Sequence, residues 1–303
     1  MSDSAPNILE VRNLQKHFPI RKGFLKRQVG TVRAVDDITF SIPRGKTVGL
    51  VGESGSGKTT AGRAILRAHQ PTDGSIRFFP ESGESIEVEK LDRNGLKNYR
   101  QYAQMIFQDP FSSLNPRMPV LDLIAEPLQA QGWSKKDYVP RVRELLKLVG
   151  LDPSFIRRYP HAFSGGQRQR IGIARALALQ PELIVADESV SALDVSVQAQ
   201  ILNLLKNLQK QFGLSFLFIA HDLSVVRYLC DEVAVMYMGK LVETAETGEL
   251  FTNPQHPYTS ILLQAAPPPD PKREWHAEKV AGEVGDLGED VVGCPFADRC
   301  AFA

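Results

Sequence analysis

The apolar positions along the chain predict strands that alternate with helices. The run at 183–186 contains no polar alternation and the run at 214–220 is almost entirely apolar, which is typical of strands buried on both faces of a sheet. Between them, apolar residues from Val197 to Phe212 recur at helical spacing before Gly213, which predicts an amphipathic helix. Because strands alternate with helices, we expect an α/β fold with a mainly parallel sheet. The other predicted strands cover residues 8–18, 34–42, 48–51, 74–79, 233–237 and 240–243.

The pattern changes from about Leu91. Apolar residues from Val120 to Leu128, and again from Val139 to Val149, show helical spacing, and Gly150 is placed to end the second helix. We therefore expect the middle of the chain to be an all-helical region that is separate from the sheet.

Composition narrows the class of protein. A chain of 303 residues has room for one large domain or two smaller ones, and 43% hydrophobic residues are enough for a core. The net charge of +1 gives no indication of a nucleic-acid partner. The sequence shows neither a signal peptide nor an apolar stretch near the roughly 20 residues of a membrane span. We expect a cytosolic, soluble protein, or one that other proteins hold at a membrane.

Basic residues cluster between Arg21 and Arg33, where they alternate with glycine. Runs of charge are usually solvated, so an exposed loop is favoured here over a membrane-surface patch.

A complete phosphate-binding loop follows the strand at 48–51 and precedes a helix that begins near Thr60. Its glycines allow the backbone N–H groups to point inward around an anion, and the helix N-terminus adds partial positive charge. In such a loop Lys58 reaches the outer phosphates and the Thr59 hydroxyl binds Mg²⁺. The loop consists of Gly52, Glu53, Ser54, Gly55, Ser56, Gly57, Lys58 and Thr59.

Two further strands end in polar groups that suit phosphate chemistry. Asp187 ends the buried run at 183–186, where a carboxylate is costly unless it holds a cation, directly or through water. Glu188 comes next and is suited to act as the base, or to orient the water, for attack on the γ-phosphate. His221 follows the run at 214–220. In parallel sheets such strand ends meet at one edge, so we expect these groups to face the phosphates.

A second motif, Phe163-Ser164-Gly165-Gly166-Gln167, occurs before the acidic pair, and Leu193-Asp194 lies after it. Together with the phosphate loop, this order resembles the ATP-binding-cassette (ABC) transporter ATPases over about residues 8–267. The resemblance implies a RecA-like P-loop NTPase core with a mainly parallel sheet, an antiparallel β subdomain and an inserted α-helical subdomain. It places the ATP-binding domain at 8–258, with the helical subdomain at about 91–175, and an extension at 259–303.

The resemblance also implies roles for individual residues in binding ATP and Mg²⁺. Phe18 matches the aromatic residue that stacks on adenine, and Gln108 matches the glutamine that touches Mg²⁺ and reports nucleotide state to the membrane partner. Glu188 and His221 match the catalytic base and the histidine that orients the γ-phosphate and the attacking water. The residues implied to bind Mg²⁺ are Thr59, Gln108 and Asp187.

The remaining implied contacts cross a dimer interface. Ser164 and Gly166 match signature residues that bind the γ-phosphate of ATP held by the opposite subunit, and Asp194 lies in a loop that signals across the dimer. The implied enzyme is thus a dimer with two ATP molecules between protomers. The resemblance also implies that Thr60, Gly165 and Gln167 take part in binding ATP.

Several runs are similar to the oligopeptide/dipeptide permease ATPases within this family. This resemblance implies import of oligopeptides or dipeptides, with a second ATPase subunit in a heterodimer, two transmembrane permease subunits and an extracytoplasmic substrate-binding protein. It places the protein peripherally at the cytoplasmic face of the inner membrane. Phe163, where most cassettes have Leu, and Ser189, where Pro is usual, leave the phosphate-contacting residues intact. The runs are 108–117, 191–196, 220–226, 256–259 and 293–300.

The three cysteines divide into two kinds. Cys230 is interpreted as a buried apolar residue. Cys294 and Cys300 are spaced like ligands of the 4Fe–4S cluster that the family's tail typically holds through more cysteines than these. A pair of thiols cannot hold such a cluster alone, so we expect the natural protein to continue beyond Ala303 with at least one more cysteine. The alternative is two free thiols on a loop.

Two other functions remain open from the sequence. A soluble, non-transport ABC ATPase that acts as a regulatory or binding protein usually carries two cassettes or a long coiled coil, and this chain shows neither. A catalytically inert half of a pair is disfavoured by the presence of Glu188, His221, Ser164 and Gly166.

Overall fold

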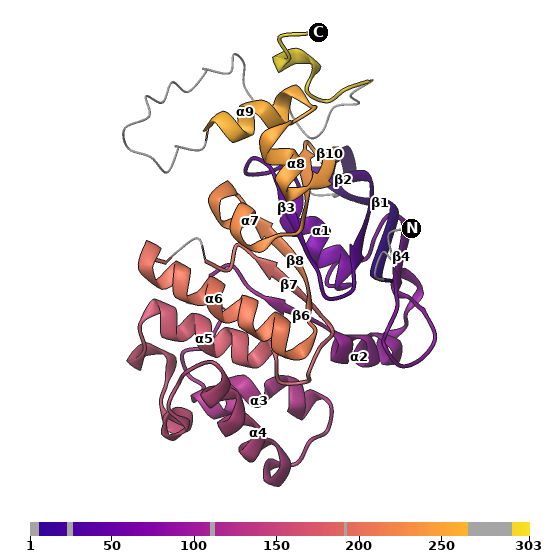
Figure 1. Ribbon diagram of the computed structural model, residues 1–303. Helices are drawn as coiled ribbons and strands as arrows, with labels where there is room; N and C mark the ends of the chain where they lie inside the picture. Colours follow the sequence, from indigo (N-terminus) through magenta and orange to yellow (C-terminus); the bar gives the residue numbers. More distant parts are fainter. Residues whose placement is uncertain (1–5, 23–26, 110–112, 191–192, 266–292) are drawn as a thin grey trace.

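The computed structural model describes residues 6–22, 27–109, 113–190, 193–265 and 293–303. Its largest layer is a six-stranded sheet with the order β10-β9-β3-β8-β7-β6 (Figure 1). All neighbours in this sheet are parallel except β9 and β10, as the alternation of strands and helices predicted. Its strands are β3 (Thr47–Val51), β6 (Ala103–Ile106), β7 (Leu183–Asp187), β8 (Ser215–Ala220), β9 (Glu232–Tyr237) and β10 (Lys240–Glu246).

A second sheet is antiparallel and has the order β2-β1-β4-β5. Its strands are β1 (Asn7–Lys22), β2 (Arg27–Pro43), β4 (Asp73–Phe78) and β5 (Ile86–Glu87). One buried cluster joins apolar side chains of both sheets, and Ala61, Ala64 and Ile65 of helix α1 (Lys58–Ile65) lie within it. The helix that follows the phosphate loop is therefore fixed between two sheets.

The other helices complete the fold. A second buried cluster contains side chains of the parallel sheet together with those of α3, α5, α6 and α7 (Figure 1). The helices are α2 (Arg93–Tyr102), α3 (Val120–Ala130), α4 (Lys135–Leu148), α5 (Gly165–Ala176), α6 (Val195–Phe212), α7 (Leu223–Leu229), α8 (Thr247–Thr252) and α9 (Pro257–Ala265), with short 3₁₀ turns at Val88–Lys90, Pro153–Arg157, Pro160–Ala162 and Ala297–Arg299.

The middle of the chain corrects one expectation. From Val120 to Ala176 it is helical, but β6 lies before these helices and pairs in parallel with β7 in the main sheet. The expectation of an all-helical region from about Leu91 is therefore wrong at its start. The strand Ala103–Ile106 has only four residues, and its two central side chains are only partly buried because β6 lies at the edge of the sheet, so it leaves no long apolar run in the sequence.

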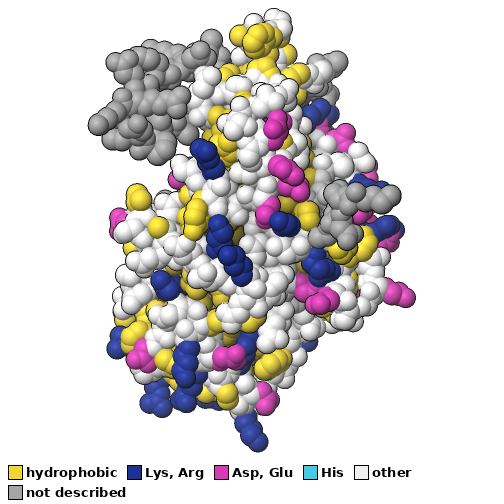
Figure 2. Space-filling view, in the orientation of Figure 1, with side chains coloured by type: hydrophobic (Ala, Val, Ile, Leu, Met, Phe, Trp, Pro, Cys, Tyr) yellow, Lys and Arg dark blue, Asp and Glu magenta, His cyan; other side chains and the backbone are white. Residues whose placement is uncertain are grey.

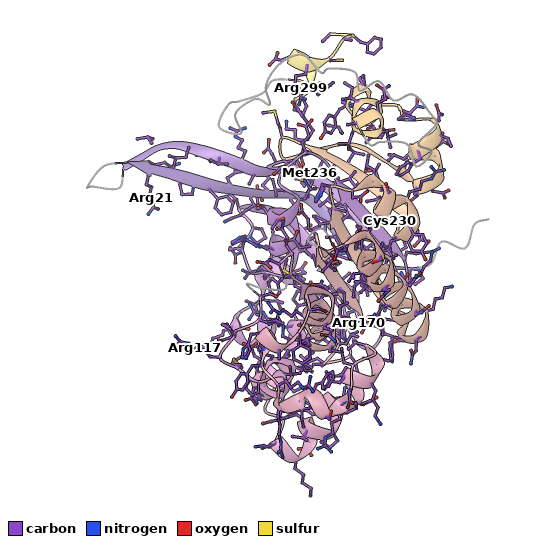
Figure 3. The ribbon with its side chains drawn as sticks, turned by 90° about the vertical axis from the view of Figure 1, so that its left-hand side faces the viewer. Arg21, Arg117, Arg170, Cys230, Met236 and Arg299 are labelled. Atoms are coloured by element: carbon purple, nitrogen blue, oxygen red, sulfur yellow. The ribbon has the colours of Figure 1, made fainter. Side chains whose placement is uncertain are left out.

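The basic segment between Arg21 and Arg33 corrects a second expectation from the sequence. This segment is the outer part of a β-hairpin in which Phe18 pairs with Val32 and Arg21 with Gln28 (Figure 3). The expectation of an exposed loop is therefore wrong for the described residues of this segment. Residues 23–26 lie outside the described part of the chain. Figure 3 shows this hairpin extending away from the body of the molecule. A two-stranded ribbon exposed on both faces is held by backbone hydrogen bonds and needs no apolar alternation, so the pattern did not reveal it.

Charged side chains are spread over the surface. Figure 2 shows Lys, Arg, Asp and Glu interspersed over the face that it presents, in keeping with a net charge of +1. Within the described residues, no helix is both long enough and apolar enough to cross a membrane.

Gly74 is the second residue of β4 and has a φ of +87°, and a Cβ atom there would lie 2.3 Å from the carbonyl oxygen of Asn13. We expect Gly74→Ala to lower the free energy of unfolding by about 2–4 kcal/mol, because both the backbone conformation and the space require glycine. Gly172→Ala is the matched control, since nothing lies within 4 Å of that added atom in helix α5. Denaturant titration should show the control unchanged or slightly stabilised; equal stability of the two variants would contradict this account.

Candidate functional site

The phosphate loop connects β3 to α1, and its shape depends on two glycines. Gly52 has a φ of +150° and Gly57 a φ of +102°. A Cβ atom at Gly57 would lie 1.9 Å from the carbonyl oxygen of Ala34, so the loop packs directly against β2. Gly57 also precedes the first turn of α1, whose N–H groups and dipole favour an anion at this point.

Lys58 is buried at the start of α1 and is only 5% exposed. Its Nζ donates hydrogen bonds to the carbonyl oxygens of Gly52 (2.8 Å) and Glu53 (2.7 Å) and to Ser56 Oγ (3.2 Å). Burial lowers the pKa of this ammonium group, while the carboxylates of Glu188, Asp187 and Glu53 act in the opposite direction. An oxyanion is therefore a favourable partner for Lys58, because it replaces the solvation that burial removes.

Asp187 ends β7 beside the loop and is 1% exposed. Its Oδ1 accepts a hydrogen bond of 2.9 Å from Thr59 Oγ1. Burial raises the pKa of the Asp187 carboxyl, against the hydrogen bond from Thr59 and the positive charge of Arg63. The hydroxyl and carboxylate are oxygen ligands of the kind that Mg²⁺ prefers, and Mg²⁺ usually needs only one or two of them beside phosphates and water. These residues fit the predicted Mg²⁺ site.

Glu188 follows Asp187 in a left-handed backbone conformation, with a φ of +43°. Such a conformation costs a non-glycine residue of order 1–3 kcal/mol and occurs preferentially at functional sites. The backbone N–H of Glu188 donates to the carbonyl of Ile219 at 2.9 Å, which ties this turn to β8.

The Glu188 carboxylate joins two other predicted residues. Gln108 Nε2 donates to its Oε2 at 2.6 Å, and His221 Nδ1 lies 3.4 Å from its Oε1. These residues follow β6, β7 and β8, so three adjacent parallel strands bring them to one edge of the sheet. Sequence reasoning placed all three near the phosphates but did not foresee that Gln108 bonds directly to Glu188.

The signature residues form a separate group at the start of α5. Ser164 is the N-cap: its Oγ accepts from Gln167 N at 3.4 Å, and Gln167 Oε1 accepts from Ser164 N at 3.1 Å. Gly166 lies against α6, because a Cβ atom there would be 2.4 Å from Val197 Cγ1. In the described residues, no hydrogen bond or ion pair connects these side chains to the phosphate loop.

We call the edge of the sheet that carries Gln108, Glu188 and His221 the catalytic edge. Phe18 and Asp194 belong to other parts of the structure. Phe18 is on β1, where its ring meets His69 edge to face at 5.6 Å and lies 4.8 Å from Lys16 Nζ. Asp194 is exposed at the N-terminus of α6. Among the other predicted loop residues, Ser54 and Gly55 are exposed, and Thr60 lies in the first turn of α1.

The cysteines only partly fit their predicted roles. Cys230 is buried as expected, and burial raises the pKa of its thiol. Cys294 Sγ lies 3.7 Å from His256 Nε2, while Cys300 is partly buried. Within the described chain, no group of three or more His, Cys, Asp or Glu side chains is arranged to hold a metal. Two cysteines supply half the ligands of a 4Fe–4S cluster, so the described residues do not fit one by themselves.

Two residues that sequence reasoning did not assign lie against the loop. The backbone N–H of Glu53 donates to Tyr258 Oη at 2.8 Å, and the Glu53 carboxylate pairs with the guanidinium of Arg299 at 3.1 and 3.3 Å. The available signal was position: Tyr258 is in the His256–Thr259 run and Arg299 is in the Gly293–Cys300 run, both singled out for their resemblance alone.

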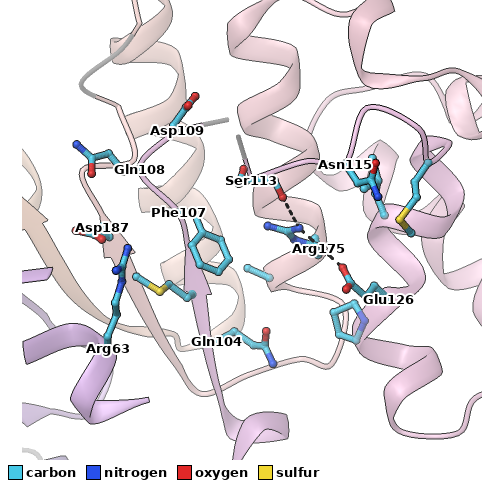
Figure 4. Close-up of a pocket in the computed structure, with 15 residues that line it drawn as sticks. Arg63, Gln104, Phe107, Gln108, Asp109, Ser113, Asn115, Glu126, Arg175 and Asp187 are labelled. Atoms are coloured by element: carbon cyan, nitrogen blue, oxygen red, sulfur yellow. Dashed lines mark hydrogen bonds and ion pairs between the residues drawn. The ribbon is translucent and has the colours of Figure 1, made fainter. Parts of the chain in front are cut away.

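A hollow of about 730 Å³ opens between the catalytic edge and the helical part (Figure 4). Gln108 and Asp187 lie on its catalytic side, and Glu126 and Arg175 on its helical side. Arg175 donates to the carbonyl of Ser113 at 2.9 Å and lies 4.0 Å from the Glu126 carboxylate. The hollow therefore lies between Gln108 and Asp187 on one side and side chains of α3 and α5 on the other.

The raised pKa of Asp187 leads to a prediction about stability. A carboxyl with a raised pKa is destabilising in its ionised form; the cost is complete above the raised pKa and disappears toward the ordinary value of 3.8. We therefore expect Asp187→Asn, measured without nucleotide, to have a higher melting temperature than the wild type at pH 8. This advantage in melting temperature should shrink as the pH falls toward 4. Mg²⁺-dependent nucleotide binding, in contrast, should be weaker in Asp187→Asn than in the wild type. Asp298→Asn is an exposed control, and a lower melting temperature for Asp187→Asn at pH 8 would contradict the argument.

Comparison with known protein families gives two matches. Residues 35–191 match the family model described as ABC transporter, and residues 242–303 match that of the oligopeptide/dipeptide transporter C-terminal region. Solved structures agree on the fold. A dimeric post-hydrolysis structure of the ATP-binding cassette MJ0796, bound to ADP and Pi, has a TM-score of 0.67 at 28% identity and covers 79% of this chain and 98% of its own. CbiO1 from Clostridium perfringens, part of the CbiONQ ABC transporter complex, has a TM-score of 0.66 at 25% identity and covers 82% and 91%.

Curated relatives narrow the group. The oligopeptide transport ATP-binding protein AppF of Bacillus subtilis is 50% identical over 98% of this chain and 90% of its own length. OppF of the same organism, also an oligopeptide transport ATP-binding protein, is 55% identical over 88% and 85%. A putative peptide import ATP-binding protein of Brucella ovis is 48% identical over 98% and 90%. With the cassette fold, the phosphate loop and the matching C-terminal region in one chain, this protein belongs to the ABC transporter ATPases, in the group of oligopeptide transport ATP-binding proteins.

Proposed function

We propose that this protein hydrolyses ATP to drive the import of oligopeptides or dipeptides through membrane permease subunits, acting peripherally at the cytoplasmic face of the inner membrane. The observation that carries the catalytic part is the contact of Glu188 with both Gln108 and His221 beside the phosphate loop. The transport part is supported by relatives of 50% and 55% identity that are named for oligopeptide transport.

In this proposal the residues divide the reaction between binding and water activation. Lys58 and the N–H groups of the loop bind the phosphates of ATP, while Thr59, Asp187 and Gln108 supply oxygen atoms for Mg²⁺, which neutralises charge on the phosphates. Glu188 accepts the proton of the attacking water, or orients that water, and His221 positions the water and the γ-phosphate. The existing contacts of the Glu188 carboxylate support this role, because they fix its orientation before substrate arrives.

The reaction requires a second ATPase subunit. Ser164, Gly165, Gly166 and Gln167 have no described bond to this chain's own phosphate loop, so we propose that they bind ATP held by the partner. A heterodimer with a homologous ATPase is our preferred assembly. Asp194 lies at the N-terminal end of α6, three residues before Val197, which packs on Gly166, and we propose that it transmits the partner's state. The dimeric form of the related cassette MJ0796 supports a two-subunit arrangement.

Further assignments extend the proposal to the rest of the chain. In the nucleotide site, Phe18 stacks on adenine, with Lys16 beside it. In the transport assembly, an extracytoplasmic substrate-binding protein delivers the substrate. The ATP-binding domain spans residues 8–258 with its helical insertion, and 259–303 form the extension. We further propose that the hollow lined by Gln108, Glu126 and Arg175 receives a cytoplasmic segment of the permease, because a segment bound there would contact Gln108 together with side chains of α3 and α5.

The 4Fe–4S cluster is a separate prediction. Cys294 and Cys300 are its candidate ligands, and the cluster would need further ligands beyond the described residues. The soluble, non-transport alternative is not favoured, because the chain matches the oligopeptide transporter C-terminal model over residues 242–303.

Glu188→Gln should keep ATP affinity close to wild type while hydrolysis falls about 100- to 1000-fold, because binding depends on the loop and water activation on the carboxylate. Retained ATP should also hold the dimer closed, which size-exclusion chromatography with ATP would show. Glu87→Gln, at an exposed ion pair with Lys90, is the control for a lost surface carboxylate. Near wild-type hydrolysis by Glu188→Gln in the assembled transporter would remove Glu188 from the proposed role.

Transport is tested on the complete assembly in proteoliposomes. The protein should copurify with two permease subunits, and ATP should drive uptake of labelled di- and oligopeptides when the substrate-binding protein is present. Lys58→Ala should abolish uptake, because the phosphates lose their main cationic partner. ATP-dependent uptake of another solute, with no peptide uptake, would overturn the substrate class but leave the ATPase assignment standing.

A further inference from the structure

We infer that the C-terminal segment 293–303 is a positioning element of the ATP site, which sets nucleotide affinity through the contact of Arg299 with Glu53. This inference rests on the proposed role of the phosphate loop in binding ATP. It is independent of the transported substrate and of any metal in the tail.

Glu53 is held at three points. Its carbonyl oxygen accepts from Lys58 Nζ at 2.7 Å, and its N–H donates to Tyr258 Oη at 2.8 Å. Its carboxylate accepts two hydrogen bonds from the Arg299 guanidinium, at 3.1 and 3.3 Å, which is a bidentate pair. Two of the three points therefore come from segments more than 200 residues away in sequence, α9 and the turn Ala297–Arg299.

The tail is anchored beside the loop by aromatic packing. Phe296 is fully buried and meets Tyr237 edge to face at 5.3 Å and Tyr258 at 5.4 Å. Tyr237 Oη accepts a further hydrogen bond from Arg299 at 3.2 Å. The Arg299 side chain is 9% exposed and that of Glu53 is 30% exposed, so the pair is better shielded than a surface ion pair. Figure 3 shows Arg299 pointing from the tail toward the body of the protein.

This arrangement affects a bound triphosphate in two ways. An unpaired Glu53 carboxylate in the loop would repel the phosphates, and Arg299 neutralises it. Tyr258 fixes the N–H of Glu53, and the carbonyl of Gly52 lies in the same peptide plane, so this contact keeps the Gly52 carbonyl oxygen directed toward Lys58, whose Nζ donates to it at 2.8 Å. The tail thus influences the charge of the loop directly through Arg299, and its geometry indirectly through Phe296, which packs on Tyr258.

The influence must be reciprocal. If tail docking strengthens ATP binding, then ATP binding strengthens tail docking by the same factor. Events at the tail would then change the nucleotide affinity of the ATPase.

The test measures binding of Mg²⁺ with a non-hydrolysable ATP analogue to the full chain. We expect Arg299→Ala to weaken binding about three- to tenfold, within the usual range of coupling between sites. Arg299→Lys should recover part of the loss, because it restores charge but not the bidentate contact. Tyr258→Phe, which removes only the oxygen that accepts from Glu53, should weaken binding by a smaller factor. Asp298→Ala, at an exposed position in the same turn, is the matched control and should bind like the wild type.

A double variant separates this effect from simple loss of structure. If Arg299 acts by neutralising Glu53, adding Glu53→Gln to Arg299→Ala should return the affinity to that of Glu53→Gln alone. Hydrogen exchange supplies the reciprocal readout: the analogue should slow exchange in residues 293–303 of the wild type but not of Arg299→Ala. Faster tail exchange in Arg299→Ala with unchanged affinity would overturn the inference, because Arg299 would then only hold the tail.

Lys58→Ala distinguishes the two levels of the argument. If Lys58→Ala leaves analogue binding unchanged, the proposed ATP site itself is wrong. If Lys58→Ala abolishes binding while Arg299→Ala and Tyr258→Phe bind like the wild type, the ATP site stands and the positioning role of the tail is wrong.

Discussion

The structure depends on keeping opposite charges out of water at the end of a parallel sheet. Lys58 and Asp187 are 5% and 1% exposed, and each has a pKa displaced by burial in the direction of its neutral form. Burial of ionised groups is unfavourable unless partners replace the lost water. The protein supplies some of these partners through loop carbonyls and the Thr59 hydroxyl, and a magnesium nucleotide has the complementary charges for both groups. The same burial that costs stability would favour the binding of phosphate and a divalent cation, which is the role proposed for this site.

The sheets and glycine positions serve this arrangement. β3, β7 and β8 are adjacent and parallel, so the loop, the Asp187–Glu188 turn and His221 all emerge at one edge. Because α1 is packed between both sheets, its N-terminus cannot shift without disturbing the buried cluster that joins them. Glu188 accepts an unfavourable backbone conformation at this edge, and its N–H bond to Ile219 on β8 holds it there.

The sequence predicted the parallel sheet and the catalytic edge because both leave local signals. Buried strands such as 183–186 read as continuous apolar runs, and polar residues directly after them indicate the strand ends. The parts that were missed lack such signals. β6 is a four-residue edge strand, and the ribbon beyond Phe18 is exposed on both faces, so neither needs a distinctive pattern. The bond between Gln108 and Glu188 depends on side-chain geometry across 80 residues of sequence. The contact of Arg299 with Glu53 spans 246 residues, and no local pattern can indicate it.

The phosphate loop and the signature are held in different ways. Gly166 at the signature packs so closely on Val197 that α5 and α6 must move together, which joins the signature to the Asp194 end of α6. Ser164 is exposed, and its Oγ makes only a 3.4 Å contact with Gln167 N, so this hydroxyl can turn to a phosphate without leaving a buried group unsatisfied. By contrast, Arg299 and Tyr258 hold the phosphate loop at Glu53. The loop therefore has its geometry fixed from within the chain, whereas the signature keeps its hydrogen-bonding capacity available. In the proposed two-subunit assembly, this division would let one subunit bind nucleotide through its loop while the signature of the second subunit encloses it.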